Sequence, residues 1–268
     1  MPQKVRLLGI QMQSVFNDKV KNYQKIAKIL AENADFKPDL VLLPEMFNTG
    51  YDAKNFEKNA ESVPADTTSM FLSGMAEKYN INIAGSMIEK IFDGSLRNSL
   101  VVFDRTGQLC AKYSKTHLFS HQGYDEGKYI KAGENIVISD LDFAKVGFSI
   151  CYDLRFPELY RTLALCGAEI VICPAAWPDV RENHWTTLLK ARAIENQFFV
   201  FGVNQVGKVT FNRKDAGKSM IVDPWGDVVA SGGGDEEVLR VEIDLDKINE
   251  AKEKIPVFQD RRTDLYEI

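Results

Sequence analysis

The sequence has 268 residues, a length that fits one large α/β domain or two small ones. Hydrophobic residues make up 45% of it and charged residues 26%, the composition of an ordinary globular protein. The 33 Lys and Arg against 38 Asp and Glu leave a net charge of −5. This balance argues against nucleic acid or an anionic membrane surface as the main partner, because both attract clustered positive charge.

Neither targeting signals nor disulfides are expected. The N-terminal segment contains only one short apolar run, and no stretch approaches the roughly 20 apolar residues that span a bilayer. The cysteines form no CxxC pair and are too few for a disulfide scaffold: they are Cys110, Cys151, Cys166 and Cys173. We therefore expect reduced thiols in a cytoplasmic protein without a membrane partner, and one of these thiols can serve as a nucleophile.

The first half of the chain alternates short apolar runs with longer amphipathic ones. The predicted strands are 5–11, 39–44, 81–91, 98–104 and 108–114, and the predicted helices are 17–33 and 69–79. The turn at 105–107 indicates that the two strands beside it are antiparallel. In the first helix we expect one buried face, formed by Val20, Tyr23, Ala27 and Leu30.

The second half combines hairpins with single strands and helices. The predicted strands are 136–140, 145–150, 169–173, 198–203 and 238–243, with a hairpin at 220–230. The predicted helices are 157–165, 184–197 and 246–255. Pro157 suits a first helical position and Gly167 a helix end. The mixture predicts a mixed sheet covered by helices, whereas strand order and layer number do not follow from the pattern.

Three polar residues follow predicted strands, where α/β folds commonly build their sites: Glu45, Lys115 and Cys151. A cysteine just ahead of a helix can have a lowered pKa, because the helix N–H groups and dipole favour the thiolate. A nearby carboxylate can take its proton, and an ammonium can stabilise an oxyanion. Taken singly, each has a plainer interpretation: a core cysteine, a capping or surface glutamate, a solvated lysine.

The segments around these residues change that interpretation. They are LLPEM at 42–46, YSKTHLF at 113–119 and GFSICYDLRFPE at 147–158. In this order the sequence resembles the nitrilase superfamily, the carbon–nitrogen hydrolases, over nearly its whole length. Further matching segments lie at 174–177, 189–196, 204–207 and 220–226. Because the motifs are spread along the chain, we expect one domain over residues 1–268.

The resemblance implies a fold and a set of roles. The fold is an α/β four-layer α-β-β-α sandwich, usually stacked as a homodimer or higher homo-oligomer with the C-terminal tail (about 246–268) at the interface. The implied catalytic residues are Glu45 as general base, Lys115 as transition-state stabiliser, Cys151 as nucleophile and Glu126 as a second glutamate. The backbone N–H of Tyr152 is implied as an oxyanion donor. No cofactor is implied, and His117 and His121 lack the third ligand of a metal site.

The same resemblance also implies a substrate class. Cys151-Tyr152-Asp153 matches the amidase branches, whereas nitrilases proper often carry Cys-Trp-Glu. Arg155 matches an arginine that ω-amidase-like members use for a substrate carboxylate, a task that suits its bidentate fork. An ion pair with Asp153 or Glu158 is the alternative for Arg155. Trp177 is either a wall of the pocket or an ordinary core aromatic.

The predicted function is therefore an ω-amidase that releases ammonia from a dicarboxylic acid monoamide such as 2-oxoglutaramate or 2-oxosuccinamate. The alternatives keep the same residues but change the substrate to an N-carbamoyl amine, a neutral amide or a nitrile. A non-catalytic binding protein on the same fold is the distant alternative.

Overall fold

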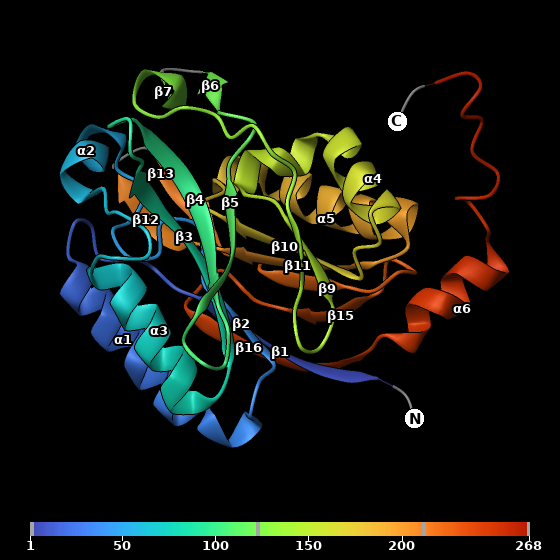
Figure 1. Ribbon diagram of the computed structural model, residues 1–268, viewed down its shortest axis with the longest axis horizontal. Helices are drawn as coiled ribbons and strands as arrows, with labels where there is room; N and C mark the ends of the chain where they lie inside the picture. The colour runs from blue at the N-terminus through green and yellow to red at the C-terminus, as the bar shows by residue number, and fades with distance from the viewer. Residues whose placement is uncertain (1–2, 122–123, 211–212, 267–268) are drawn as a thin grey trace.

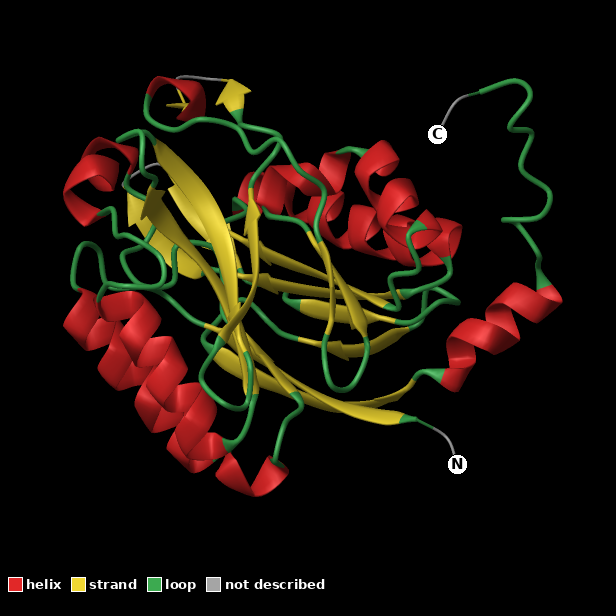
Figure 2. Cartoon of the chain, viewed as in Figure 1, coloured by secondary structure: helices red, strands yellow, loops and turns green. Residues whose placement is uncertain are grey.

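The computed structural model describes residues 3–121, 124–210 and 213–266. Two six-stranded sheets pack face to face, and helices cover the outer face of each (Figures 1 and 2). The layers are therefore α-β-β-α, as the resemblance predicts. No helix in these described ranges has both the length and the apolarity that crossing a membrane requires.

The first sheet has the order β16-β1-β2-β3-β4-β5. Its strands are β1 (Lys4–Gln11), β2 (Leu40–Leu42), β3 (Asn82–Lys90), β4 (Leu96–Phe103), β5 (Leu109–Ser114) and β16 (Glu237–Asp244). β1, β2 and β3 are parallel, and two antiparallel steps through β4 bring β5 back to the direction of β3. The carboxyl ends of β2 and β5 therefore lie at the same edge. Helices α1 (Lys19–Glu32) and α3 (Thr67–Tyr79) cover the outer face.

The second sheet has the order β15-β14-β11-β10-β9-β8. Its strands are β8 (Ile138–Asp140), β9 (Lys145–Phe148), β10 (Ile170–Ala175), β11 (Phe199–Asn204), β14 (Met220–Val222) and β15 (Val228–Ser231). β9, β10 and β11 are parallel, so the segments that follow β9 and β10 leave the sheet at one edge. Helices α4 (Pro157–Leu165) and α5 (Glu182–Asn196) cover its outer face.

Strand alternation divides the apolar side chains among three layers of core. On β1, Leu7 belongs to the cluster between the two sheets, and its neighbour Leu8 packs outward among residues of α1 and α3. Between them, Gly9 allows close approach of the sheets, because a Cβ there would lie 3.0 Å from a methyl carbon of Val203. The second sheet packs against α4 and α5 through a third cluster, which includes Leu163.

The predicted helices and the long strands are present, with ends shifted by a few residues. The predicted face of α1 is partly wrong: Val20 is 62% exposed, whereas Asn22, Ile26 and Leu30 are buried. Asn22 is buried because its side-chain amide pairs with main-chain groups of Val15 and Asn48. The buried face of α1 therefore includes a polar residue, Asn22, which the pattern of apolar residues did not predict.

Several short elements were not predicted. They are β6 (Ser120–His121), β7 (Tyr124–Asp125), β12 (Val206–Thr210), β13 (Arg213–Ala216), α2 (Phe56–Asn59) and the single 3₁₀ turns η1 (Ala34–Phe36), η2 (Ala53–Asn55), η3 (Glu126–Lys128), η4 (Cys151–Arg155) and η5 (Asp179–Arg181). The last helix, α6 (Asp246–Lys254), buries Ile248 and Ala251. Beyond it, residues 255–266 form no further helix or strand (Figure 1); Ile255 and Phe258 still contact Gln197 and Arg161 of the main body.

Candidate active site

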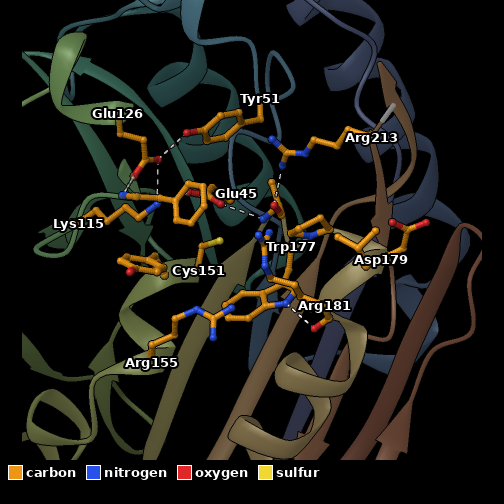
Figure 3. Close-up of a pocket in the computed structure, with 15 residues that line it drawn as sticks. Glu45, Tyr51, Lys115, Glu126, Cys151, Arg155, Trp177, Asp179, Arg181 and Arg213 are labelled. Carbon is orange, nitrogen blue, oxygen red and sulfur yellow. Dashed lines mark hydrogen bonds and ion pairs between the residues drawn. The ribbon is translucent and has the colours of Figure 1, made fainter. Parts of the chain in front are cut away.

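A cavity of about 190 Å³ opens at the edge where β2, β5, β9 and β10 end. All the site residues predicted from the sequence line it, together with residues that were not predicted (Figure 3). The lining residues are Glu45, Tyr51, Lys115, Phe119, Glu126, Cys151, Tyr152, Arg155, Ala176, Trp177, Pro178, Asp179, Val180, Arg181 and Arg213. Strands that are far apart in the sequence therefore place their polar groups together in one cavity.

The Glu45 carboxylate is fully buried and held on both oxygens. Its Oε1 accepts hydrogen bonds from Asn98 Nδ2 at 2.8 Å and from Lys115 Nζ at 3.1 Å. Its Oε2 accepts from the backbone N–H of Ala176 at 2.8 Å. The last contact ties the end of β2 in one sheet to the end of β10 in the other, so this carboxylate has a fixed place beside Cys151.

Lys115 lies between two carboxylates and is 2% exposed. Its Nζ donates to Glu45 Oε1 at 3.1 Å and to Glu126 Oε1 at 2.9 Å. Burial by itself favours the neutral amine, but the charges of Glu126 and Glu45 outweigh it and raise the pKa of Lys115 well above its usual value. The side chain is therefore a permanent ammonium at neutral pH.

Glu126 is anchored on both of its oxygens. Besides Lys115, its Oε1 accepts from the hydroxyl of Tyr51 at 2.7 Å, and its Oε2 accepts from the backbone N–H of Phe119 at 2.6 Å. Burial is the main cause that raises the pKa of Tyr51 well above its usual value, so this phenol remains a donor. The arrangement fits a carboxylate that positions the lysine.

Cys151 stands where β9 gives way to the 3₁₀ turn η4, and its φ of +48° lies in the left-handed region. Such a backbone is strained for a residue with a side chain and is typical of functional turns. The lowered pKa considered for this thiol is wrong. Burial raises the pKa well above its usual value and the charge of Glu45 raises it further, while Lys115 and the N–H of Ala176 offset this only in part.

The local backbone explains this difference from the sequence prediction. η4 spans only Cys151–Arg155, and α4 does not begin until Pro157. The cysteine therefore has no long helix behind it to stabilise a thiolate. It is a partly buried thiol next to a carboxylate that is placed to accept its proton.

Asp153 connects the segment that carries the cysteine to the segment that carries Lys115. It is fully buried, and its Oδ2 accepts from the backbone N–H of Ile150 at 2.9 Å and from the hydroxyl of Tyr113 at 2.7 Å. Its Oδ1 accepts from the backbone N–H of His117 at 3.0 Å and lies 2.8 Å from that residue's Nδ1. His117 is thus part of this network, and no cluster suited to a metal ion occurs among the described residues.

Arg155 lines the cavity and does not form the alternative ion pair. Its guanidinium carbon lies 4.5 Å from the ring centroid of Trp177 and 5.8 Å from that of Tyr152. Its Nη1 is 3.3 Å from Nδ1 of His184. Within the described part of the chain no ion pair joins Arg155 to Asp153 or Glu158, so that alternative is wrong.

Trp177 has both of the roles that the sequence left open. It lines the cavity, yet it is only 2% exposed and packs beside Trp185 with ring centroids 5.5 Å apart. Its indole Nε1 donates to the main-chain oxygen of Arg181 at 2.8 Å. The tryptophan is therefore a pocket wall that is also part of the core.

Sequence reasoning missed several members of the site: Tyr51, Asn98, Ala176, Arg181 and Arg213. Tyr51 had a usable signal, since it lies only six residues beyond Glu45 in the segment after β2. Arg213 had none, because it lies on β13, a short polar strand that pairs with β12 outside the two six-stranded sheets. Its Nη2 donates to the main-chain oxygen of Ala176 at 2.8 Å and pairs with Asp215 at 3.1 Å.

Comparison with known proteins identifies the family of this chain. A family model described as "Carbon-nitrogen hydrolase" matches residues 6–253. The 2-oxoglutaramate amidase of Bacillus subtilis is 40% identical over 90% of this chain and 92% of its own length. Human omega-amidase NIT2 is 33% identical over 99% of this chain and 97% of its own.

Solved structures of similar fold include Nit3 of Saccharomyces cerevisiae, a member of branch 10 of the nitrilase superfamily, with a TM-score of 0.88 and 32% identity over 97% of both chains. A carbon–nitrogen hydrolase of Helicobacter pylori has a TM-score of 0.91 and 27% identity over 98% of this chain and 97% of its own. The family match and the identity to relatives along nearly the whole length show that this chain belongs to the carbon–nitrogen hydrolase family.

Proposed function

We propose that this protein is an ω-amidase, which hydrolyses the terminal amide of a dicarboxylic acid monoamide such as 2-oxoglutaramate and releases ammonia. The observation that carries the proposal is the placement of Cys151, Glu45 and Lys115 in one cavity that also holds the Arg155 guanidinium. The first three groups suit attack on an amide carbon, and the arginine suits a carboxylate at the other end of the substrate. The names of the Bacillus subtilis and human relatives agree with this substrate class.

In the first half-reaction Glu45 accepts the proton of the Cys151 thiol as the sulfur attacks the amide carbon. Because burial and the Glu45 charge raise the pKa of the thiol, the proposed scheme has the proton leave as the sulfur attacks. The carbonyl oxygen becomes an oxyanion beside the Lys115 ammonium and the backbone N–H of Tyr152. Glu45 then donates the proton to the nitrogen, the C–N bond breaks, and ammonia leaves a thioester on the cysteine.

In the second half-reaction water replaces ammonia. Glu45 accepts a proton from the water as its oxygen attacks the thioester carbon, and the same oxyanion donors hold the carbonyl oxygen. Collapse of this intermediate breaks the C–S bond, and the sulfur regains its proton from Glu45. Glu126 takes no proton in this scheme, since its oxygens are committed to Lys115, Tyr51 and Phe119.

The test is an ammonia-release panel with the wild-type enzyme, Cys151→Ala and Arg155→Ala. The substrates are 2-oxoglutaramate, 2-oxosuccinamate, glutaramate, butyramide, a nitrile and an N-carbamoyl amine. We expect turnover of the carboxylate-bearing amides, none with Cys151→Ala, and a fall in kcat/KM of at least about tenfold with Arg155→Ala on these amides but not on butyramide. Cys110→Ala makes the same change at an exposed thiol and should leave turnover intact.

The panel also decides between this proposal and its alternatives. Preference for the nitrile, the N-carbamoyl amine or butyramide would assign the same residues to a different substrate. Release of ammonia from none of these substrates would favour a binding protein. Intact-mass detection of an acyl adduct on the wild-type chain but not on Cys151→Ala would identify the nucleophile directly.

We also propose that the enzyme is a cytoplasmic homodimer. All of its cysteines are free, as expected for a reducing compartment. The segment after α6 carries exposed apolar side chains at Ile255, Leu265 and Tyr266, which are suited to a partner surface.

A further inference from the structure

Two arginines face the cavity from neighbouring turns. Arg155 lies at the end of η4, and Arg181 lies at the end of η5. Figure 3 shows both beside Trp177, on the far side of Cys151 from Glu126 and Lys115. A substrate whose amide reaches the cysteine would therefore extend its other end toward this pair.

Trp177 contacts the side chain of Arg155 and the main chain of Arg181. The face of its ring lies 4.5 Å from the Arg155 guanidinium carbon, and its indole N–H donates to the main-chain oxygen of Arg181 at 2.8 Å. The tryptophan is itself held by Asn204, whose Oδ1 accepts from the Trp177 backbone N–H at 2.7 Å. Trp177 thus stacks on the Arg155 guanidinium and holds the main chain of Arg181 next to it, while the Arg181 guanidinium carbon lies 6.0 Å from the ring centroid of Phe119.

Arg155 differs from Lys115 and Arg213, which also line the cavity, in its ionic partners. The Lys115 ammonium lies between two glutamates, and Arg213 pairs with Asp215. Among the described residues, no carboxylate lies within ion-pair distance of Arg155. Burial lowers the pKa of Arg155, and the positive charge of Arg181 lowers it further. An anion between the two guanidinium groups would relieve their repulsion.

We infer that Arg181, together with Arg155, recognises the 2-oxo acid end of the substrate and rejects the corresponding 2-amino acid. This inference rests on the proposed ω-amidase function. A 2-oxo acid presents its carboxylate and an adjacent carbonyl oxygen, both of which accept hydrogen bonds from guanidinium groups. A 2-amino acid such as glutamine carries the same terminal amide, but it presents an ammonium that two guanidinium charges repel.

The test uses Arg181→Gln with 2-oxoglutaramate, glutaramate and L-glutamine, which differ only at carbon 2. The substitution leaves the main-chain oxygen that Trp177 contacts in place. We expect kcat/KM to fall at least about tenfold for 2-oxoglutaramate and no more than about threefold for glutaramate. The preference for 2-oxoglutaramate over L-glutamine should fall at least about tenfold.

Two further variants separate the effect of the Arg181 charge from a general loss of structure. Arg181→Lys keeps the positive charge but loses the fork, so it should still reject L-glutamine while binding 2-oxoglutaramate less well. Arg240→Gln is the matched control: it removes an arginine charge at a surface ion pair with Asp35, away from the cavity, and should match the wild type. If Arg181→Gln does not fold, the Arg181→Lys profile still decides the inference.

The results distinguish this inference from the proposed function. If the wild type hydrolyses 2-oxoglutaramate but Arg181→Gln slows all three substrates equally, or none, Arg181 has no part in recognising carbon 2 and the inference is overturned alone. If the wild type prefers L-glutamine, or hydrolyses none of the three, both the inference and the ω-amidase proposal are overturned.

Discussion

The Glu45 carboxylate lies beside the Cys151 thiol and raises its pKa. The thiol is partly buried and lies next to a negative charge, and both conditions favour the protonated sulfur. The opposing influences, the Lys115 ammonium and the Ala176 N–H, are weaker. A thiol poised beside its base differs from the preformed thiolate of cysteines with a lowered pKa, and the two give opposite responses when the carboxylate is removed.

We therefore predict that Glu45→Gln lowers the pKa of Cys151 while it abolishes amide hydrolysis. The charge of Glu45 is one of the causes that raise this pKa, so a neutral amide in its place increases the thiolate fraction at any given pH. The measurement is the rate of Cys151 alkylation by iodoacetamide against pH, followed by peptide mass. The curve should move to lower pH in Glu45→Gln, and ammonia release should fall by at least about 10²-fold. Slower alkylation in the variant would contradict this account.

Removing Lys115 should damage both activity and stability. Lys115→Met leaves two buried carboxylates without their cation, and breaking such a buried pair costs about 3–5 kcal/mol of unfolding free energy. Loss of one oxyanion donor lowers kcat by roughly 10²–10³-fold. Urea unfolding and ammonia release measure the two effects. Lys131→Met, at an exposed pair with Asp93, is the matched control and should cost at most about 1 kcal/mol.

Among the elements, the turns after β5 and β9 must keep a fixed distance, because they carry the lysine and the cysteine. Asp153 is the link between them: it accepts from Ile150 at the end of β9 and from Tyr113 and His117 around the end of β5. A buried carboxylate that uses both oxygens in this way specifies geometry and tolerates little change.

Asp153→Asn should therefore impair catalysis through position. One oxygen becomes an NH₂ group that faces N–H or O–H donors, so at least one buried hydrogen bond to a charged acceptor is lost, at about 1.5–3 kcal/mol. Because misplacement by about 1 Å can cost 10²-fold, we expect kcat to fall by about that factor with a smaller change in KM. Asp235→Asn, on the exposed surface, is the control. A variant with unchanged kcat would remove Asp153 from this role.

Local chemistry decided which elements were predictable. The turn at 105–107 and Pro157 act through neighbouring residues, and the strand pair and helix beside them form as predicted. The buried face of α1 was misjudged because Asn22 is buried by hydrogen bonds to distant loops, which no periodicity records. The same reason hid Arg213, whose partner Ala176 lies 37 positions away.

The residues of the candidate site likewise fall into those that local sequence predicted and those that only the fold brings together. Glu45, Lys115 and Cys151 were found because each stands in a recognisable segment at a strand end, and Glu126 because a family pattern pointed to its loop. Tyr51 and Asn98 support Glu126 and Glu45 through contacts that only the fold creates. The direction of the Cys151 pKa was missed because burial and a neighbouring carboxylate are three-dimensional facts.

At the scale of the whole molecule, one edge of the stacked sheets holds the cavity, while the C-terminal segment leaves the body elsewhere (Figure 1). α6 is anchored by Ile248 and Ala251, and Gln197 Nε2 donates to the main-chain oxygen of Ile255 at 2.8 Å. Beyond these contacts, Leu265 is 69% and Tyr266 45% exposed. Apolar side chains that stay exposed contribute little to the stability of a single chain. Burial of these side chains against a second copy would stabilise the dimer.

The proposed homodimer predicts that the C-terminal segment determines the oligomeric state. Light scattering coupled to size exclusion should give the wild type twice the mass of one chain, and deletion of residues 257–268 should lower it to that of one chain. Leu265→Ser combined with Tyr266→Ser should weaken the dimer without shortening the chain, because it removes apolar surface that the partner would bury. Thermal unfolding of both variants at low protein concentration checks that each chain is folded. A wild type with the mass of one chain, or a deletion variant that stays a dimer, would show that this segment does not hold two copies together.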